Sequence, residues 1–256
     1  MPAYNAAKTI EATIKDIPEY CYDSIIVVDD ASSDNTVGIA QEHASVTKVI
    51  VHESNRGYGG NQKSLYKAAL DEGADIIVLL HPDNQYNPAI VPNIILPLLL
   101  DQADVVFASR FIQDPLKGGP VIGGMPLIKY FVNRGLTTLQ NWMMGTFFTE
   151  FHTGYRAYNK ASLEVIDFDK LSDDFVFDNE IIAPLVHLKL RFHQIGVETR
   201  YFKEASSINY LRGSIYAWGC LTVGFHYFLH RIGLKRWPFL NECIRSVKGS
   251  SSSGNL

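Results

Sequence analysis

Short apolar runs rich in valine and isoleucine alternate with segments of helical periodicity through the first part of the chain. The runs predict strands over residues 24–28, 46–51, 75–80 and 104–108, and the third is apolar on both faces, as in a buried parallel strand. The segments between them predict helices over residues 33–43, 58–72 and 88–101. This order of elements predicts an α/β fold with a doubly wound, mostly parallel sheet flanked by helices.

The beginning of the chain departs from this alternation. Residues 1–5 lead directly into a helical stretch over residues 6–16, which leaves almost no room for the strand with which such a fold normally starts. We therefore expect either a truncated chain or a sheet that is built without its first strand.

The second half of the chain predicts helices over residues 125–144, 160–166 and 179–190 and a strand over residues 197–202. Residues 214–229 form an unusually aromatic helical run, which is followed by Arg231, Lys235 and Arg236. Such a run is typical of a membrane interface, but a helix packed on the main domain or a homodimer contact would have the same pattern. With no internal repeat or clear linker, we expect one domain with a helical, aromatic C-terminal extension.

Composition excludes several classes of protein. The net charge of −4 and the pI of about 6.1 provide no basic field for nucleic acid. The three cysteines form neither a CxxC pair nor a zinc-binding spacing, which favours a reducing compartment. The N-terminus has no signal-peptide pattern, and no run reaches the roughly 18 apolar residues that span a bilayer. We expect a cytoplasmic chain, peripheral at most on the cytosolic membrane face.

The predicted strand over residues 75–80 ends in a polar segment that contains His81, Asp83, Asn84 and Gln85. A carboxylate at the carboxyl edge of an open α/β sheet lies where such sheets bind ligands. Its hard oxygen atoms suit Mg²⁺ or Mn²⁺ holding a diphosphate. The alternative is a polar turn between strand and helix, since Asp, Asn and Pro are common turn residues.

Two further motifs follow predicted strands. Asp29 and Asp30 close the first strand, where an acid can accept hydrogen bonds from a base N–H or from ribose hydroxyls; the residues after them are typical helix caps. The glycine-rich segment from Asn55 to Asn61 would allow close backbone approach and leave N–H groups free for an anion. Its spacing matches neither a Walker nor a Rossmann motif.

Candidate phosphate-binding and catalytic residues lie further along the chain. Arg110 follows the fourth predicted strand and Arg134 lies on the next helix, and arginine suits bidentate phosphate contacts. For Arg134 the alternative is a solvated helix face. Asp174 and Asp178 lie beside phenylalanines, whose partial desolvation would raise a carboxyl pKa toward that of a general base. Helix N-capping is the alternative for Asp178.

Taken in chain order, these segments resemble the family 2 glycosyltransferases with the GT-A fold, and within them the polyprenyl-phosphate sugar synthases of the dolichyl-phosphate mannosyltransferase type. The resemblance covers residues 1–212. Residues 2–5 are similar to the family's opening P-A-Y-N, residues 29–36 to its D-D-x-S-x-D-x-T and residues 55–57 to its N-x-G. Residues 109–110 resemble its S-R pair, and residues 153–156 its (S/T)-G-F-R. Residues 81–85 fall on its D-x-D-x-Q, with His81 in the place of the first acid, and the family's first strand should precede Pro2.

The resemblance implies roles for particular residues. A divalent metal, Mg²⁺ or Mn²⁺, would be held by Asp83 and Gln85. Arg110 would act in catalysis and bind the acceptor phosphate together with Arg134 and Arg156, and Asp178 or Asp174 would be the base if one is needed. The nucleotide sugar would be bound by Pro2, Ala3, Tyr4, Asp29, Asp30, Asn55, Gly57, His81 and Asp83.

The implied reaction is the inverting transfer of a hexose from a UDP- or GDP-sugar to a polyprenyl phosphate. Transfer to a saccharide hydroxyl in cell-envelope polysaccharide synthesis and a catalytically inactive nucleotide-sugar binding protein stay open as alternatives. A nucleotidyltransferase is disfavoured because its glycine-rich N-terminal signature is absent. We expect a nucleotide-sugar half over residues 1–112, an acceptor half over 113–212, the extension over 213–245 and a disordered tail over 246–256.

Overall fold

The computed structural model describes residues 1–112, 119–199 and 210–245. The expected tail over 246–256, the first residues of the acceptor half and residues 200–202 of the last predicted strand lie outside these ranges. Among the described residues, no helix is long and apolar enough to cross a membrane.

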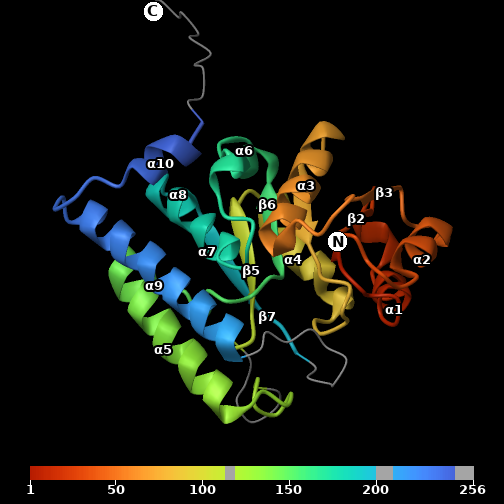
Figure 1. Ribbon diagram of the computed structural model, residues 1–256, viewed down its shortest axis with the longest axis horizontal. Coiled ribbons are helices and arrows are strands. Elements are labelled where there is room, and N and C mark those ends of the chain that lie inside the picture. Colours follow the sequence, from red (N-terminus) through yellow and green to blue (C-terminus); the bar gives the residue numbers. More distant parts are fainter. Residues whose placement is uncertain (113–118, 200–209, 246–256) are drawn as a thin grey trace, which may run out of the picture.

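The strands form two sheets that lie next to one another (Figure 1). The first sheet is entirely parallel and has the order β1-β2-β3. The second has the order β4-β6-β5-β7, in which β6 runs antiparallel to both neighbours and β5 pairs parallel with β7. The strands are β1 (Pro2–Ala3), β2 (Ile26–Asp29), β3 (Lys48–Val51), β4 (Ile76–Leu79), β5 (Val105–Ser109), β6 (Arg156–Asn159) and β7 (Phe192–Gly196).

Helices cover both faces of the strands, and the period-2 geometry of β5 shows why. Val105 and Phe107 point into a core shared with α3 and α8, whereas Val106 and Ala108 point into a second core shared with α1 and α4. The helices are α1 (Ile10–Lys15), α2 (Thr36–Glu42), α3 (Gly57–Asp71), α4 (Val91–Leu99), α5 (Leu127–Met144), α6 (Lys160–Glu164), α7 (Phe177–Glu180), α8 (Ile182–His187), α9 (Tyr210–Arg231) and α10 (Pro238–Cys243), with 3-10 turns η1 (Glu19–Cys21), η2 (Pro88–Ile90) and η3 (Phe168–Lys170).

The mostly parallel α/β architecture is confirmed, with three differences in its strands. The first strand, expected to be missing, is present over Pro2–Ala3 and pairs with β2. The antiparallel strand β6 was not predicted, because its sequence Arg-Ala-Tyr-Asn has no apolar run. The last strand in the described part of the chain is β7 at residues 192–196, which ends just before the predicted strand over 197–202 would begin. Arg191 donates to Asp104 at 2.8 Å and so sets where β7 begins to pair with β5.

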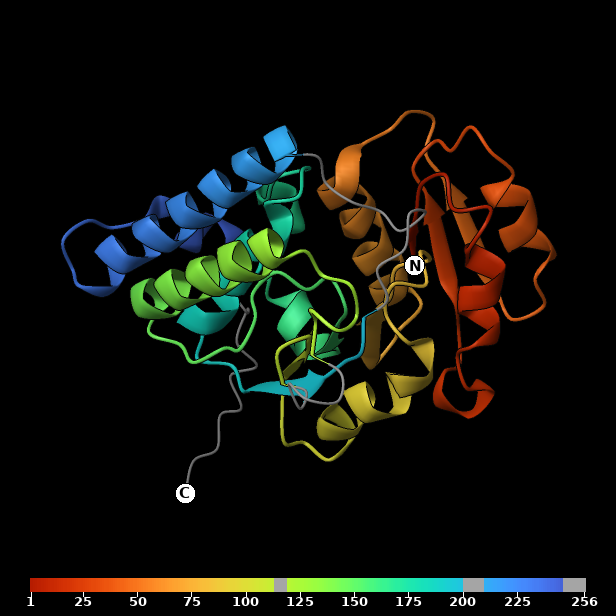
Figure 2. The same ribbon diagram turned by 90° about the horizontal axis from the view of Figure 1, so that it is seen from below.

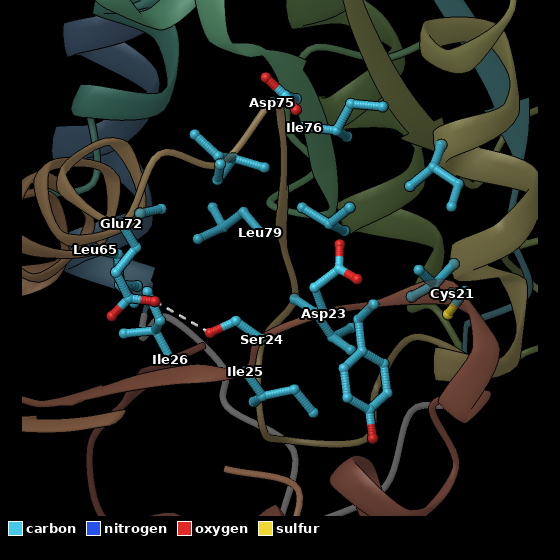
Figure 3. Close-up of a pocket in the computed structure, with 18 of the residues that line it drawn as sticks. Cys21, Asp23, Ser24, Ile25, Ile26, Leu65, Glu72, Asp75, Ile76 and Leu79 are labelled. Atoms are coloured by element: carbon cyan, nitrogen blue, oxygen red, sulfur yellow. Dashed lines mark hydrogen bonds between the residues drawn. The ribbon is translucent and has the colours of Figure 1, made fainter. Parts of the chain in front are cut away.

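A cavity of about 500 Å³ lies between the amino-terminal approach to β2 and the length of β4 (Figure 3). Its wall is mainly aliphatic, with residues 23–26 on one side, residues 75–80 on the other and Leu65 from α3. The amino group of Met1 is buried beside it and donates to the carbonyl of Ile26 at 2.6 Å. Burial lowers the pKa of this amino group to about 5. None of the polar motif residues that follow β2 and β4 lines this cavity.

Candidate active site

The loops after β1 and β2 are tied together by the side chains of the D-D-x-S-x-D-x-T segment at residues 29–36. The backbone N–H of Asn5 donates to Ser32 Oγ at 2.8 Å, and that of Ala6 donates to Thr36 Oγ1 at 2.8 Å. Asp29 in turn accepts from the backbone and hydroxyl of Ser32. The cross-link leaves the ring of Tyr4 exposed at the rim of the carboxyl edge. It brings the predicted nucleotide-binding residues 2–4 and 29 into one place.

Asp30 fixes the loop that precedes α3. Its buried carboxylate lies 2.7 Å from His52 Nδ1 and accepts from the backbone N–H groups of Arg56 at 2.8 Å and Gly57 at 3.0 Å. Asn55 reinforces the same turn, accepting from Gly57 N–H at 3.1 Å. The predicted nucleotide-binding residues 30, 55 and 57 are therefore adjacent, and the acid among them already contacts three polar groups of the protein.

The first turn of α3 is packed against the loop that leads to α7. The N–H groups of Gly59 and Gly60 both donate to the carbonyl of Asp173, at 2.7 and 3.2 Å. These are among the groups that the sequence suggested for binding an anion, and that expectation is wrong for both because the protein occupies them. Gly57 has φ of +84°, and a Cβ there would lie 2.6 Å from the same carbonyl.

A half-buried cluster joins α3, the end of β4 and α7. The ring of Tyr58 stacks on that of His81, with centroids 5.5 Å apart, and its hydroxyl donates to Asp178 at 2.9 Å. Gln62 donates to the other carboxylate oxygen at 3.1 Å. Burial, and then the charge of Asp178, raise the pKa of Tyr58, which keeps its hydroxyl a donor. Gly154 closes the cluster, since a Cβ there would lie 2.8 Å from Tyr58 Oη and collide with the His81 ring.

His81 and Asp83 have different surroundings although they are two residues apart. Burial lowers the pKa of His81, and its Nδ1 atom is buried without a hydrogen-bond partner among the described residues. Asp83 is half-buried on the loop after β4, where its Oδ1 accepts from Gln85 N–H at 3.1 Å. Among the described residues, no three His, Cys, Asp or Glu side chains are placed to share a metal.

The arginines predicted to bind the acceptor lie around residues 149–152. Arg110 forms an ion pair with the buried carboxylate of Glu150 and also donates to the carbonyl of His152 at 3.2 Å. Arg134 donates to the carbonyl of Thr149 at 2.7 Å. This segment continues to Gly154, where an added Cβ would collide with the His81 ring, so it connects the two arginines to the His81 cluster.

Arg156 has different surroundings from the other two arginines. It is fully buried, and its guanidinium donates to the carbonyls of Phe151, Thr153 and Asp178 at 2.7 to 3.0 Å. These bonds brace the loops on either side of β6. Asp174 is also apart from the cluster, on an exposed turn where it accepts from the N–H of Phe175 at 2.7 Å. The roles predicted for Arg156 and Asp174 stay predictions.

Comparison with known proteins assigns the family. The model of the family described as "Glycosyl transferase family 2" matches residues 1–166, which is more than half of the chain. The chain belongs to glycosyl transferase family 2. The predicted resemblance is thereby confirmed, and the chain is a glycosyltransferase.

Relatives of this family 2 glycosyltransferase include enzymes named for lipid phosphates. The UDP-N-acetylglucosamine–dolichyl-phosphate N-acetylglucosaminyltransferase of Methanococcus voltae is 29% identical over 94% of this chain and 96% of its own. The undecaprenyl-phosphate mannosyltransferase of Micrococcus luteus is 26% identical, and the match covers 67% of this chain and 69% of that protein.

Solved structures support the GT-A fold. Glucosyl-3-phosphoglycerate synthase of Mycobacterium tuberculosis, in complex with Mn²⁺, UDP-glucose and glycerol 3-phosphate, superposes with a TM-score of 0.64. The superposition covers 91% of this chain and 79% of the synthase at 18% identity. At this identity the likeness shows the fold alone.

Sequence reasoning missed three residues of this candidate site. Tyr58 and Gln62 lie one helical turn apart on α3, so both can reach Asp178. Their spacing was visible in the sequence, but their common partner lies far along the chain. Glu150 was missed because nothing in its neighbourhood indicates that it is fully buried against Arg110.

Proposed function

We propose that this chain transfers a hexose from a UDP- or GDP-linked sugar to a polyprenyl phosphate, with inversion at the anomeric carbon. The observation that carries the proposal is the Asp83 carboxylate, half-buried at the carboxyl edge of the sheet beside the His81–Tyr58–Asp178 cluster. The acceptor class is supported by relatives whose names include dolichyl phosphate and undecaprenyl phosphate.

The donor would lie on the loops after β1 and β2. Asp30 is engaged with His52 and the turn before α3, so its contribution is to hold residues 55–57 in place. The exposed ring of Tyr4 and the loop that Asp29 shapes provide the rim for the nucleoside. His81 and Asp83 would then lie toward the diphosphate end of the donor.

The residues of the β4 loop fit a divalent cation. Only Oδ1 of Asp83 accepts a hydrogen bond from a described residue, and the side-chain carbonyl of Gln85 is a second hard oxygen. One or two protein oxygens, completed by substrate phosphates and water, are the usual environment of Mg²⁺. Asp83 and Gln85 would hold Mg²⁺ or Mn²⁺, which would neutralise the charge that develops on the departing diphosphate.

Arg110 and Arg134 would orient the acceptor. An anionic phosphate oxygen attacks the anomeric carbon and forms a new C–O bond, while the bond to the diphosphate breaks and its electron pair leaves with the nucleoside diphosphate. Because the attacking oxygen carries no proton, this reaction needs no base, and the task of the protein is positioning. Arg156 is fully buried against three carbonyls, so we assign the acceptor phosphate to Arg110 and Arg134.

Transfer to a saccharide hydroxyl is the second candidate, since Asp178 lies in the cluster and could accept a proton. The two acceptors can be distinguished with Asp178→Asn. Transfer to a short-chain polyprenyl phosphate should fall by less than about tenfold, because no proton is removed. Transfer to a hydroxyl should fall by about a hundredfold or more.

The proposal is tested with labelled UDP- and GDP-sugars, a short-chain polyprenyl phosphate and Mg²⁺ or Mn²⁺. The expected product is a polyprenyl-phosphate sugar with the anomeric configuration inverted, as read by NMR. Asp83→Ala should reduce turnover by at least about a thousandfold with an unchanged unfolding midpoint. The matched control is Asp71→Ala on the exposed end of α3. Near-normal turnover of Asp83→Ala would overturn the assignment of the metal site.

A further inference from the structure

Helices α5 and α9 lie side by side at the end of the molecule farthest from the first sheet (Figures 1 and 2). They pack closely through their inner sides: a Cβ on Gly224 would lie 2.5 Å from the Met143 methyl group. Trp142 of α5 stacks on Phe228 of α9 with ring centroids 4.8 Å apart. The pair therefore forms one outer layer of the molecule.

The outer sides of both helices are apolar. Phe131 is 68% exposed and Trp218 is 74% exposed, although large aromatic side chains are normally buried to a much greater extent. The exposed residues recur at spacings of three, seven and eleven, which places them on one side of each helix. They are Ile128, Phe131 and Trp142 on α5 and Ile215, Trp218 and Phe225 on α9.

The same helices and their flanking segments are free of acidic residues. Neither residues 119–149 nor residues 210–241 contain an Asp or a Glu, although the whole chain has 27 of them and a net charge of −4. The charges in these segments are all positive, on Lys129, Arg134, Arg212, Arg231, Lys235 and Arg236. An apolar helix side with only basic residues around it is typical of an interfacial helix on anionic lipid.

We propose that the outer face of the α5–α9 pair docks on the surface of an anionic phospholipid bilayer. The apolar side chains enter the boundary between headgroups and acyl chains, and the basic residues meet lipid phosphates. A second copy of this chain is a poorer occupant, because the same face would meet its own positive charge.

The position of this face relative to the site supports the proposal. Arg134 belongs to α5, and the neighbouring Asn133 donates to Glu150, the partner of Arg110, at 3.1 Å. Docking through α5 would thus bring the acceptor arginines close to the bilayer surface, where a polyprenyl phosphate resides. This last step rests on the proposed function; the docking itself does not.

The test is flotation of the full chain with vesicles of phosphatidylcholine alone or of phosphatidylcholine with phosphatidylglycerol. Binding is expected only to the anionic vesicles and should weaken as salt is raised. Trp218→Ser should lower the partition coefficient about tenfold, and Lys235→Glu by a similar factor. The matched controls are Tyr20→Ser, at a ring that is 84% exposed on η1, and Lys170→Glu on η3, both of which should bind like the parent.

Two results would overturn the proposal. The first is that the parent chain binds neither kind of vesicle. The second is that Trp218→Ser and Lys235→Glu bind the anionic vesicles as strongly as the parent chain does. Turnover on a short-chain acceptor in solution is measured in parallel for every variant. Full turnover without vesicle binding would reject the docking face and leave the proposed function intact. Vesicle binding without transfer would support the docking face and reject the proposed function.

Discussion

Single side chains divide the site into residues that shape it and residues that remain available to a substrate. Asp30, Asp178 and Arg156 are buried and bonded to protein groups from other segments, so all three help to hold loops in place. Asp83 is half-buried and engaged through one oxygen by a described residue. Where the family has an acid, His81 is stacked on Tyr58. The metal proposal therefore depends on Asp83 and not on His81.

Tyr58→Phe tests whether the cluster is held by its hydrogen bond or only by its stacking. The variant keeps the ring against His81 but removes the donor 2.9 Å from Asp178. We expect the free energy of unfolding to fall by about 2 kcal/mol, because a buried carboxylate loses a hydrogen bond. Urea denaturation measures this, with Tyr20→Phe as the exposed control. Equal midpoints for the two variants would show that the bond contributes nothing.

The helices and strands differ in how well they can be predicted from the local sequence. The strands β2 to β5 were predicted because each has a Val/Ile run, and the helices α3 and α5 because each has a clear apolar periodicity. Strand β6 could not be predicted, since it has no apolar run and is set by its pairing with β4 and β5, which lie far away in the sequence. The site was predicted only in part for the same reason: local motifs identified Asp83 and Asp178, whereas Tyr58 acquires its role from a partner 120 residues away.

The start of α3 packs very closely against the loop that leads to α7. A Cβ on Gly59 would lie 2.8 Å from Phe177 Cβ, so the helix can approach the α7 loop only with glycine there. Gly59→Ala should lower the free energy of unfolding by about 2 kcal/mol. On α5, no described atom lies within 4 Å of a Cβ built on Gly135, so Gly135→Ala should raise it by about 1 kcal/mol. Equal effects of the two substitutions in urea denaturation would contradict this account of the packing.

In the described part of the chain the strands form two sheets, and the neighbouring edges of these sheets do not pair with each other. Strands β1 and β4 are outer strands of their sheets. Strand β4 borders the aliphatic cavity (Figure 3), and Met1, directly before β1, is also one of the residues that line it. Pro2 pairs with Val28, so residues added before Met1 in the same register would run along residues 23–26. An unpaired strand edge is a template for another strand.

We expect a chain extended before Met1 by four β-branched apolar residues to be more stable. The added strand would fill the aliphatic cavity and move the amino group out of it. Between pH 5 and 8 the unfolded amino group holds a proton that the buried one, with a pKa of about 5, releases. The stability of the present chain should therefore rise with pH across this window, by on the order of 4 kcal/mol. The extended chain should lack this rise.

An extension of four Gly and Ser residues separates the effect of filling the cavity from the effect of moving the amino group. It also moves the charge, so it should abolish the pH-dependent rise, but it offers no apolar side chains for the cavity and little tendency to form a strand. Urea denaturation at several pH values measures the free energy of unfolding of all three chains. At pH 8 we expect the chain with the apolar extension to be the most stable and the chain with the Gly/Ser extension to be about as stable as the parent. Acidic side chains at the cavity, such as Asp23 and Asp75, are common to all three chains and cancel in the comparison. An apolar extension no more stable than the Gly/Ser extension would show that the space between β2 and β4 does not accept a strand.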